Sequence, residues 1–338
     1  MKKVRVEDSI GLTICHDITA MFDGFKGPLF KRGHVIREED IERLLDIGKR
    51  SIFVYEENAG EIHEEEAAVR LGNLSKIENF HMTKPSEGKI TGISDTEGLL
   101  IINKELMHKV NSIKDITICT LPNHYHVNQG TCFSSMRVVP LMIPEERIKQ
   151  AEEICKGDSL YKIVPFSHRK VAVIITGSEV YHGRIIDKFE SVARKKLSKY
   201  PCDIIGVTIC DDSLEMITNV SDKYLQEGAD LIIYSGGMSV DPDDLTPTVI
   251  RETGAEIISY GVPSQPGNMT LIAYKGNVAL IGVPGAAISM PTTIFDAVLP
   301  QLFTDIRFTK EDLINLSEGG LCQKCTTCHF PNCTFGRY

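Results

Sequence analysis

The chain has 338 residues, a length at which two or three domains and a sizeable buried core are expected. Its formal net charge is −9, and phosphate backbones are bound through clustered Lys and Arg, so nucleic acid is excluded as an expected partner. No apolar run approaches the roughly 20 residues of a membrane span. The first residues also lack the apolar centre of a signal peptide. We therefore expect a cytoplasmic protein that makes no use of a membrane.

Residues 1–62 predict an N-terminal segment of mixed α+β type. The pattern begins with a strand at 3–6 and a turn-rich stretch at 23–28. Apolar residues then recur at helical spacing over 38–48, and Gly48 is a stop signal for that helix. A strand at 51–55 completes the segment.

Residues 63–165 predict a β-rich domain. Short apolar or β-branched runs are divided there by Gly, Asn, Asp and Pro. We expect strands at 90–93, 99–102, 116–120 and 136–142, a short helix at 145–155 and a linking segment at 157–167.

Residues 166–308 predict an α/β domain. The run at 171–175 is continuously apolar, as expected for a strand buried on both faces. Further strands at 204–209, 230–234 and 257–262 alternate with amphipathic helices; a hairpin over 271–283 and a last helix reaching about residue 303 follow. Such alternation predicts right-handed crossovers and a three-layer α/β/α arrangement around a mostly parallel sheet.

Each predicted strand of this domain ends in an unusual turn. In order, the turns are Thr176-Gly177-Ser178-Glu179, Asp211-Asp212, Ser235-Gly236-Gly237-Met238-Ser239-Val240-Asp241, Gln265-Pro266-Gly267-Asn268 and Val283-Pro284-Gly285. Ligands bind at the carboxyl ends of parallel strands, and glycine lets backbone N–H groups approach an anion closely. Five such turns therefore indicate a site for a small phosphate-bearing ligand.

Carboxylates are frequent at the same edge, which we expect to carry Glu179, Asp187, Asp211, Asp212, Asp230, Asp241, Asp243 and Asp244. Beside phosphate, a carboxylate can hold Mg²⁺ or accept N–H donors from a heterocycle. The alternative is a helix cap, which fits Asp187, Asp211 and Asp212 because each precedes a predicted helix.

These turns, together with Gly183-x-Ile-x-Asp187, resemble the molybdopterin-binding domain of the molybdopterin molybdenumtransferases, the bacterial relatives of the gephyrin E-domain. The resemblance implies insertion of molybdate into adenylylated molybdopterin with Mg²⁺, release of AMP, and a homodimer. It implies catalytic roles for Asp187, Asp230 and Asp244. It also implies that the pterin and its phosphate contact Thr176, Gly177, Ser178, Glu179, Asp212, Ser235, Gly236, Gly237, Ser239, Asp241, Pro266, Gly267, Pro284 and Gly285.

The chain departs from the family pattern at several positions. Ser178 stands where the family has Asp, Phe189 where it has Asn, and Asn268 where it has a phosphate-pairing Lys. A C-terminal β-barrel domain is not recognisable. These departures leave open a carrier or chaperone that holds the cofactor and delivers it to a molybdoenzyme. The competence-damage-inducible nucleotide pyrophosphatases share the first turn but normally carry that domain at the N-terminus.

The segment 309–338 predicts a cysteine-rich tail. Cys322, Cys325, Cys328 and Cys333 form the pattern C-x2-C-x2-C-x4-C, which resembles the ferredoxin-type run that binds a [4Fe–4S] cluster. Zinc is the competing metal, with His329 as a further potential ligand, and a disordered, reduced tail is the remaining alternative. A metal here would also suit a metal-responsive binding protein.

Overall fold

The structure is a computed structural model and describes residues 1–22, 24–56, 60–239 and 241–337. Asp23 of the predicted turn, Val240 of the third strand-end turn and Tyr338 of the tail lie outside these residues. The chain divides into two compact units. The first is Met1–Asp95, Ile102–Leu121 and Gly130–Lys162, and the second is Thr96–Ile101, Pro122–Gln129 and Ile163–Tyr338. Within the described ranges, none of the helices has the length and apolar character needed to cross a membrane.

The N-terminal part of the first unit is a small α+β structure. Its elements are β1 (Lys2–Arg5), η1 (Val6–Asp8), β2 (Ile18–Phe22), β3 (Phe25–Phe30), α1 (Glu38–Asp46) and β4 (Ser51–Val54). The predicted helix at 38–48 is confirmed, and Gly48 follows it with a φ of +77°, as its stop signal requires. Most of the predicted turn at 23–28 is instead strand β3, paired antiparallel with β2.

The remainder of the first unit is a four-stranded antiparallel sheet covered by helices. Its elements are β5 (Glu61–His63), α2 (Glu64–Gly72), β6 (Phe80–Met82), β7 (Lys89–Ser94), α3 (Lys104–Asn111), β9 (Ile116–Thr120), β11 (Cys132–Val138), β12 (Met142–Pro144) and α4 (Glu145–Ile154). The sheet has the order β6-β7-β11-β9. The expected strand at 136–142 is divided, because Pro140 offers no N–H to a ladder. Helices α2 and α3 were not predicted.

The second unit contains a small sheet and a large one. The small sheet, in the order β10-β8-β13, is formed by β8 (Gly98–Ile102), β10 (Tyr125–Val127) and β13 (Tyr161–Pro165). Strand β13 lies where a linking segment was expected.

The large sheet has six strands in the order β15-β14-β16-β19-β18-β17. They are β14 (Arg169–Thr176), β15 (Cys202–Cys210), β16 (Leu231–Ser235), β17 (Glu256–Tyr260), β18 (Leu271–Lys275) and β19 (Val278–Val283). Pairs β14–β15, β14–β16 and β16–β19 are parallel, and β18 is antiparallel to both its neighbours. The predicted mostly parallel sheet and its hairpin are confirmed.

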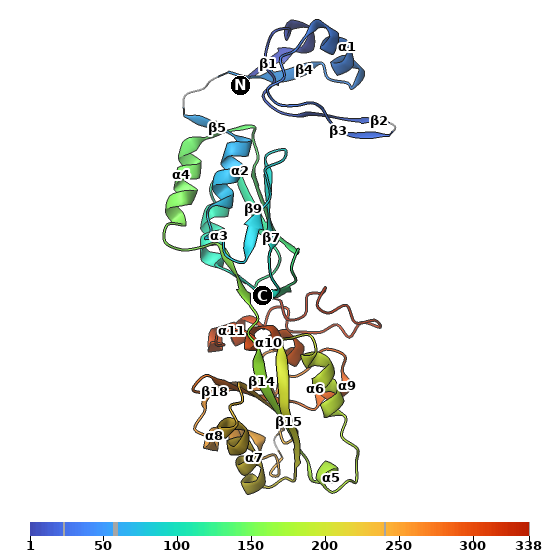
Figure 1. The fold of residues 1–338 in the computed structure, drawn as a ribbon, viewed down its shortest axis with the longest axis vertical. Coiled ribbons are helices and arrows are strands. Elements are labelled where there is room, and N and C mark those ends of the chain that lie inside the picture. Colours follow the sequence, from blue (N-terminus) through green and yellow to red (C-terminus); the bar gives the residue numbers. More distant parts are fainter. Residues whose placement is uncertain (23, 57–59, 240, 338) are drawn as a thin grey trace. The chain divides into compact units, whose positions relative to one another are not determined.

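Helices cover both faces of the large sheet (Figure 1). Helices α6 (Phe189–Leu197), α10 (Ile294–Leu302) and α11 (Lys310–Asn315) pack on one face, and α7 (Leu214–Gln226) and α8 (Thr246–Glu252) on the other. Along β14, Val171 and Val173 join the first core while Ala172 and Ile174 join the second. Burial on both faces explains the continuous apolar run of this strand.

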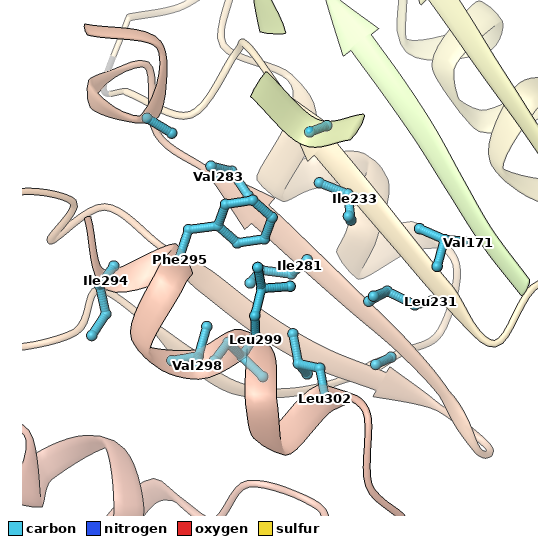
Figure 2. Close-up of a cluster of buried hydrophobic side chains, with 14 of the residues drawn as sticks. Val171, Leu231, Ile233, Ile281, Val283, Ile294, Phe295, Val298, Leu299 and Leu302 are labelled. Carbon is cyan, nitrogen blue, oxygen red and sulfur yellow. The ribbon is translucent and has the colours of Figure 1, made fainter. Parts of the chain in front are cut away.

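Helix α10 contributes five buried residues to the first core, and its apolar side chains lie against the strands (Figure 2). The single last helix that we expected is in fact two, α9 (Ala286–Ser289) and α10, separated by a segment that contains Pro291. Helix α5 (Ser178–Tyr181) is a single turn after β14. Neither α5 nor α11 was predicted.

Candidate functional site at the carboxyl edge of the sheet

The five turns singled out in the sequence all follow strands that run in the same direction. Strands β14, β15, β16 and β19 are mutually parallel. Strand β17 runs with them, because it and β19 are each antiparallel to β18. All five strands therefore end at one side of the sheet, called here the carboxyl edge, which is where ligands bind in folds of this type.

The first and third turns are packed directly together. Gly236 has a φ of +95°, and a Cβ atom at this position would lie 2.0 Å from the carbonyl oxygen of Thr176. The Thr246 hydroxyl donates to the Gly236 carbonyl at 2.8 Å and lies 3.5 Å from the Thr176 hydroxyl. A Cβ atom at Gly237 would lie 3.0 Å from the Thr246 hydroxyl oxygen. Only glycine fits here, so these residues form a fixed backbone corner.

The first and second turns are joined by a hydrogen bond from the Ser178 amide to Asp212 Oδ2 at 2.8 Å. Gly177 precedes that amide with a φ of +149°, and its own N–H donates to the Cys210 carbonyl at 3.2 Å. Because Ser178 uses its backbone for this contact, the replacement of the family's Asp by Ser178 does not remove the link between the turns.

Negative charge gathers around Asp212. Burial raises the pKa of Asp212 above its ordinary value; the Ser178 amide opposes this, and the charges of Glu179, Asp211 and Asp244 raise the pKa further. His182 Nε2 lies 3.4 Å from Asp211 Oδ2. The second turn is therefore an acidic cluster that favours a counter-charge.

The third turn continues through Ser235, which is buried, to the exposed residues Ser239 and Asp241. The Asp241 amide donates to Asp244 Oδ2 at 3.3 Å, and the Asp244 amide donates to the Asp241 carbonyl at 3.0 Å. Asp244 is thus held in a local turn while its charge acts on Asp212.

The fourth and fifth turns are connected to the same edge by other contacts. The Tyr260 hydroxyl at the end of β17 donates to the Met238 carbonyl at 3.1 Å. The Met238 side chain packs on Gly282 of β19, where a Cβ atom would lie 2.5 Å from the Met238 sulfur. The Pro266 carbonyl accepts from the Ile294 amide at 3.1 Å.

Gly267, with a φ of +108°, packs so closely on Ile294 that a Cβ would lie 2.8 Å from its side chain. Pro284 is buried and Gly285 is exposed just before α9. These contacts join the third turn to the ends of β17 and β19 and the fourth turn to the start of α10, and a shared ligand site of all five turns stays a prediction.

Asp187 acts as a helix cap. Its Oδ1 accepts from the Phe189 amide at 2.9 Å and its Oδ2 from the Glu190 amide at 2.8 Å, at the start of α6. Both carboxylate oxygens are therefore engaged by the first turn of the helix. The capping alternative accounts for this residue, and its part in a reaction stays a prediction. Helix α7 is capped by Ser213, not by Asp211 or Asp212.

Asp230 is not at the carboxyl edge, and the expectation that it lies among these turns is wrong. It precedes β16, so it lies at the opposite, amino edge. Its Oδ2 accepts from the Lys170 amide at 2.8 Å, its own amide donates to the Lys170 carbonyl, and its carbonyl accepts from the Ala279 amide. Asp230 joins the starts of three strands.

Sequence reasoning missed two residues of the site. Thr246 is the first residue of α8, and its hydroxyl donates to the Gly236 carbonyl. Tyr260 ends β17 and supports the third turn. In the sequence, each of these residues is only a polar residue close to a glycine turn. Their roles could not be predicted, because each hydrogen bond joins separate segments of the chain.

The carboxylates at this edge are suitable ligands for a cation, but the protein alone does not supply a complete coordination sphere. Across the described ranges, no three His, Cys, Asp or Glu side chains converge on a metal-ion position. Mg²⁺ is usually held by one or two carboxylates together with substrate phosphates and water. The acidic cluster around Asp212 supplies carboxylates of that kind.

Two segments of the chain match known family models. Residues 172–304 match the family described as "Probable molybdopterin binding domain", and residues 3–56 match a domain of unknown function, DUF8806. Residues 172–304 extend from strand β14 through helix α10 and include all five turns.

Curated relatives agree with the first match. The molybdopterin molybdenumtransferase of Haemophilus influenzae is 28% identical over 140 residues, which are 39% of this chain and 34% of the relative. A CinA-like protein of Mycobacterium sp. strain JLS is 36% identical over 90 residues, which are 26% of this chain and 21% of the relative. The chain thus spans about a third and a fifth of these two proteins.

Among solved structures, the molybdopterin biosynthesis MoeA protein of Pyrococcus horikosii covers 89% of this chain and 74% of its own length at 13% identity. Its TM-score of 0.32 is too low to support an argument. The family match covers residues 172–304, the range that contains the glycine turns at the carboxyl edge. It shows that the α/β domain of this chain is similar to the probable molybdopterin-binding domain, over less than half of the chain.

Proposed function

We propose that the chain acts in molybdenum cofactor biosynthesis, binding adenylylated molybdopterin at the carboxyl edge and inserting molybdate with release of AMP. The observation that carries the proposal is the contact of the first and third turns, where Thr176 and Gly236 approach so closely that no side chain fits between them. Such a corner presents backbone N–H groups to an anion without needing Lys or Arg.

The charge distribution supports Mg²⁺ as the cation of the reaction. Asp212 and Asp244, with Glu179 nearby, would hold Mg²⁺ together with the phosphates of the substrate, and the cation would neutralise the charge of those phosphates. Burial is the main cause that raises the pKa of Asp212, and the charges of Glu179, Asp211 and Asp244 raise it further, so these carboxylates lie close enough to share a cation.

The residues of this chain would then divide the work by position. Backbone amides of Gly236, Gly237 and Gly285 would bind the anionic groups of the pterin, while the Gly177 amide stays bonded to the Cys210 carbonyl. Asp244 would orient the cation, and Asp187 would position α6 beside the first turn rather than touch the substrate. We do not extend a catalytic role to Asp230, since it lies at the other edge of the sheet.

A carrier of the finished cofactor is the second candidate. Asn268 stands in the fourth turn, where the resembled family has a phosphate-pairing Lys. Without that cation, binding of the phosphate that is transferred in the reaction would be weaker. The resemblance also leads us to propose a homodimer and, for the carrier, a molybdoenzyme as recipient. Light scattering of the purified chain tests the dimer.

The deciding experiment is a single-turnover assay with the full chain, adenylylated molybdopterin, molybdate and Mg²⁺. We expect AMP to be released in an amount close to that of the protein. Pterin retained without AMP release would support the carrier, and no retained pterin would contradict both.

Asp244→Asn and Asp243→Asn make a matched pair for the cation site. Asp243 is exposed, whereas Asp244 is partly buried and acts on Asp212. We expect AMP release to fall at least tenfold in the first variant and to stay near the wild-type rate in the second. Equal rates in the two variants would remove Asp244 from the proposed role.

A further inference from the structure

The cysteine-rich tail is folded against the second unit although it has almost no regular structure. Between residues 319 and 337, the described backbone forms no helix or strand beyond one isolated bridge to Gln265. The Gln265 amide donates to the Gly320 carbonyl at 2.7 Å, and the Cys322 amide donates back to the Gln265 carbonyl at 2.8 Å. These two bonds hold the first cysteine beside the fourth turn of the carboxyl edge.

Three glycines bring the tail backbone into close contact with itself and with the domain. A Cβ would lie 2.5 Å from the Arg337 carbonyl at Gly319, 2.2 Å from the Leu316 carbonyl at Gly320, and 2.6 Å from the Ala297 Cβ at Gly336. Phe335 is 2% exposed. The tail therefore has one specific path and is not the disordered segment considered as an alternative.

The end of the tail is tied to the β8–β10 region of the same unit. The Tyr125 hydroxyl donates to the Asn332 side chain at 2.9 Å, and the Arg337 guanidinium lies 4.3 Å from the centre of the Tyr125 ring. Few apolar side chains are buried along this path, so hydrophobic burial does not account for the order of the segment. A cross-link between its parts would.

The four cysteines supply the groups for such a cross-link, because all of them line one cavity. The cavity has a volume of about 200 Å³ and is closed on one side by Met290, Pro291 and Thr292, the segment between α9 and α10. Cys322 and Cys333 are partly buried, and Cys325 and Cys328 are exposed. Four thiols from one irregular segment, residues 322–333, that line the same cavity indicate a metal or metal cluster bound there.

The spacing of these thiols favours a cluster over a single ion. Four cysteines on one Zn²⁺ place each sulfur about 2.3 Å from the metal, so neighbouring sulfurs would be about 3.8 Å apart. Over the described residues, no three such side chains converge on one metal-ion position. The sequence spacing C-x2-C-x2-C-x4-C resembles the ferredoxin-type run, in which each cysteine sulfur binds a different iron of a [4Fe–4S] core, whereas two separated C-x-x-C pairs are more usual for zinc.

Two of the sulfurs already have partners suited to a thiolate. The Lys324 amide points to Cys322 Sγ at 3.4 Å, made possible by a φ of +54° at Lys324. Thr292 Oγ1 and Cys328 Sγ are 3.1 Å apart. Once Cys328 has lost its proton, the Thr292 hydroxyl is the donor of this bond. Hydrogen bonds to the sulfurs are among the interactions that tune Fe–S clusters.

We propose that Cys322, Cys325, Cys328 and Cys333 bind one [4Fe–4S] cluster in the cavity beside Thr292. A cluster-assembly donor delivers the preformed cluster; each thiol gives up its proton, forms one bond to one iron and displaces the donor's ligand from that iron, so no iron changes its oxidation state. The bound cluster fixes the tail against the fourth turn and against the start of α10.

The test uses the full chain, reconstituted without oxygen from ferric iron, sulfide and a dithiol that supplies the reducing electrons. We expect about four iron atoms and four acid-labile sulfides per chain, and an electron paramagnetic resonance signal after reduction with dithionite. Stoichiometric zinc in the protein as isolated, with no iron retained after reconstitution, would overturn the proposal in favour of a zinc site. Retention of neither metal would overturn any metal site here.

Cys325→Ser and Cys119→Ser are a matched pair of exposed cysteines, only the first of which lines the cavity. We expect Cys325→Ser to lose at least half of its iron and Cys119→Ser to match the wild type. Equal iron contents would contradict the assignment. Circular dichroism and pterin retention check that each variant is folded, so that loss of iron is not loss of fold.

Proteolysis gives a readout that is independent of activity. Lys324 is exposed in the middle of the tail, and a Lys-specific protease should cleave there at least tenfold more slowly when the cluster is bound. The Cys325→Ser variant should be cleaved quickly with or without added iron and sulfide. Cleavage that is equally slow in the apo and reconstituted wild type would show that the tail is ordered by the protein alone.

Discussion

The two edges of the large sheet use the same residue types for different purposes. At the carboxyl edge, glycines from separate strands pack together, and the carboxylates of Glu179, Asp211 and Asp244 act on the buried Asp212. At the amino edge, Asp230 spends its carboxylate on the Lys170 amide and its carbonyl on the Ala279 amide. The role of an aspartate here follows from the end of the strand at which it lies, because all parallel strands turn at the same place.

The largest effect that we expect comes from the corner between the first and third turns. Gly236→Ala would drive a Cβ into the Thr176 carbonyl while holding a left-handed backbone, a combination that we expect to cost about 3 kcal/mol or more. Because the chain has no tryptophan, unfolding in urea is followed by circular dichroism. A much smaller shift of the midpoint would show that the corner can open.

Gly183→Ala is the control for that variant. Gly183 also has a left-handed φ, +68°, but a Cβ there would meet no atom within 4 Å. We expect only the backbone penalty of about 1–2 kcal/mol. The difference between the two variants isolates the steric contact with Thr176.

The second prediction tests whether Asp187 only caps helix α6 or also takes part in the reaction. Asp187→Ala removes the acceptor of two amides at the start of α6 and should cost about 1 kcal/mol of stability. Because this aspartate acts through the helix in our proposal, Asp187→Asn should recover part of that loss and keep AMP release near the wild-type rate. A normal urea midpoint with AMP release reduced tenfold would instead place Asp187 on the substrate.

The amino edge should respond less, and in stability alone. Asp230→Ala leaves the Lys170 amide without its side-chain acceptor at a position open to water, so we expect a loss of about 0.5–1 kcal/mol. Mg²⁺-dependent AMP release should be unchanged. If release fell as it should in Asp244→Asn, the contrast between the two edges would fail as a guide to function.

The same contrast explains how much the sequence could predict. The run through Val173 and Ile174 shows burial on both faces, so the direction of the strands and the shared edge of their turns follow from the pattern alone. Asp230 was misplaced because it was matched to a family motif rather than to its position before a strand. Its hydrogen bonds reach Lys170 and Ala279, which are distant in the sequence.

Local patterns were weakest where elements are short or where contacts depend on the fold. Helix α5 is a single turn and α11 has six residues, too few for a helical period to show. The support of Gly236 by Thr246 depends on two turns meeting in space. The cysteine spacing predicted a metal site, but only the folded tail shows that the four thiols share one cavity.

The smallest expected effect is a pH dependence at the carboxyl edge. Burial and the neighbouring carboxylates raise the folded-state pKa of Asp212 above its unfolded value. This group therefore contributes stability below the unfolded pKa and loses that contribution as pH rises through the raised one. Asp212→Asn carries no titrating group and can still accept from the Ser178 amide. The urea midpoint of the variant, relative to the wild type, should therefore rise across that interval.

Mg²⁺ turns this pH dependence into a test of the cation site. A cation bound by the ionised carboxylates stabilises the folded state and releases the Asp212 proton. Added Mg²⁺ should therefore raise the urea midpoint of the wild type at neutral pH and have less effect on Asp212→Asn. Equal responses of the two proteins would mean that the carboxylates repel one another without holding a cation before the phosphates arrive. The acidic cluster would then be completed by the substrate, and the carboxyl edge would bind metal and ligand only together.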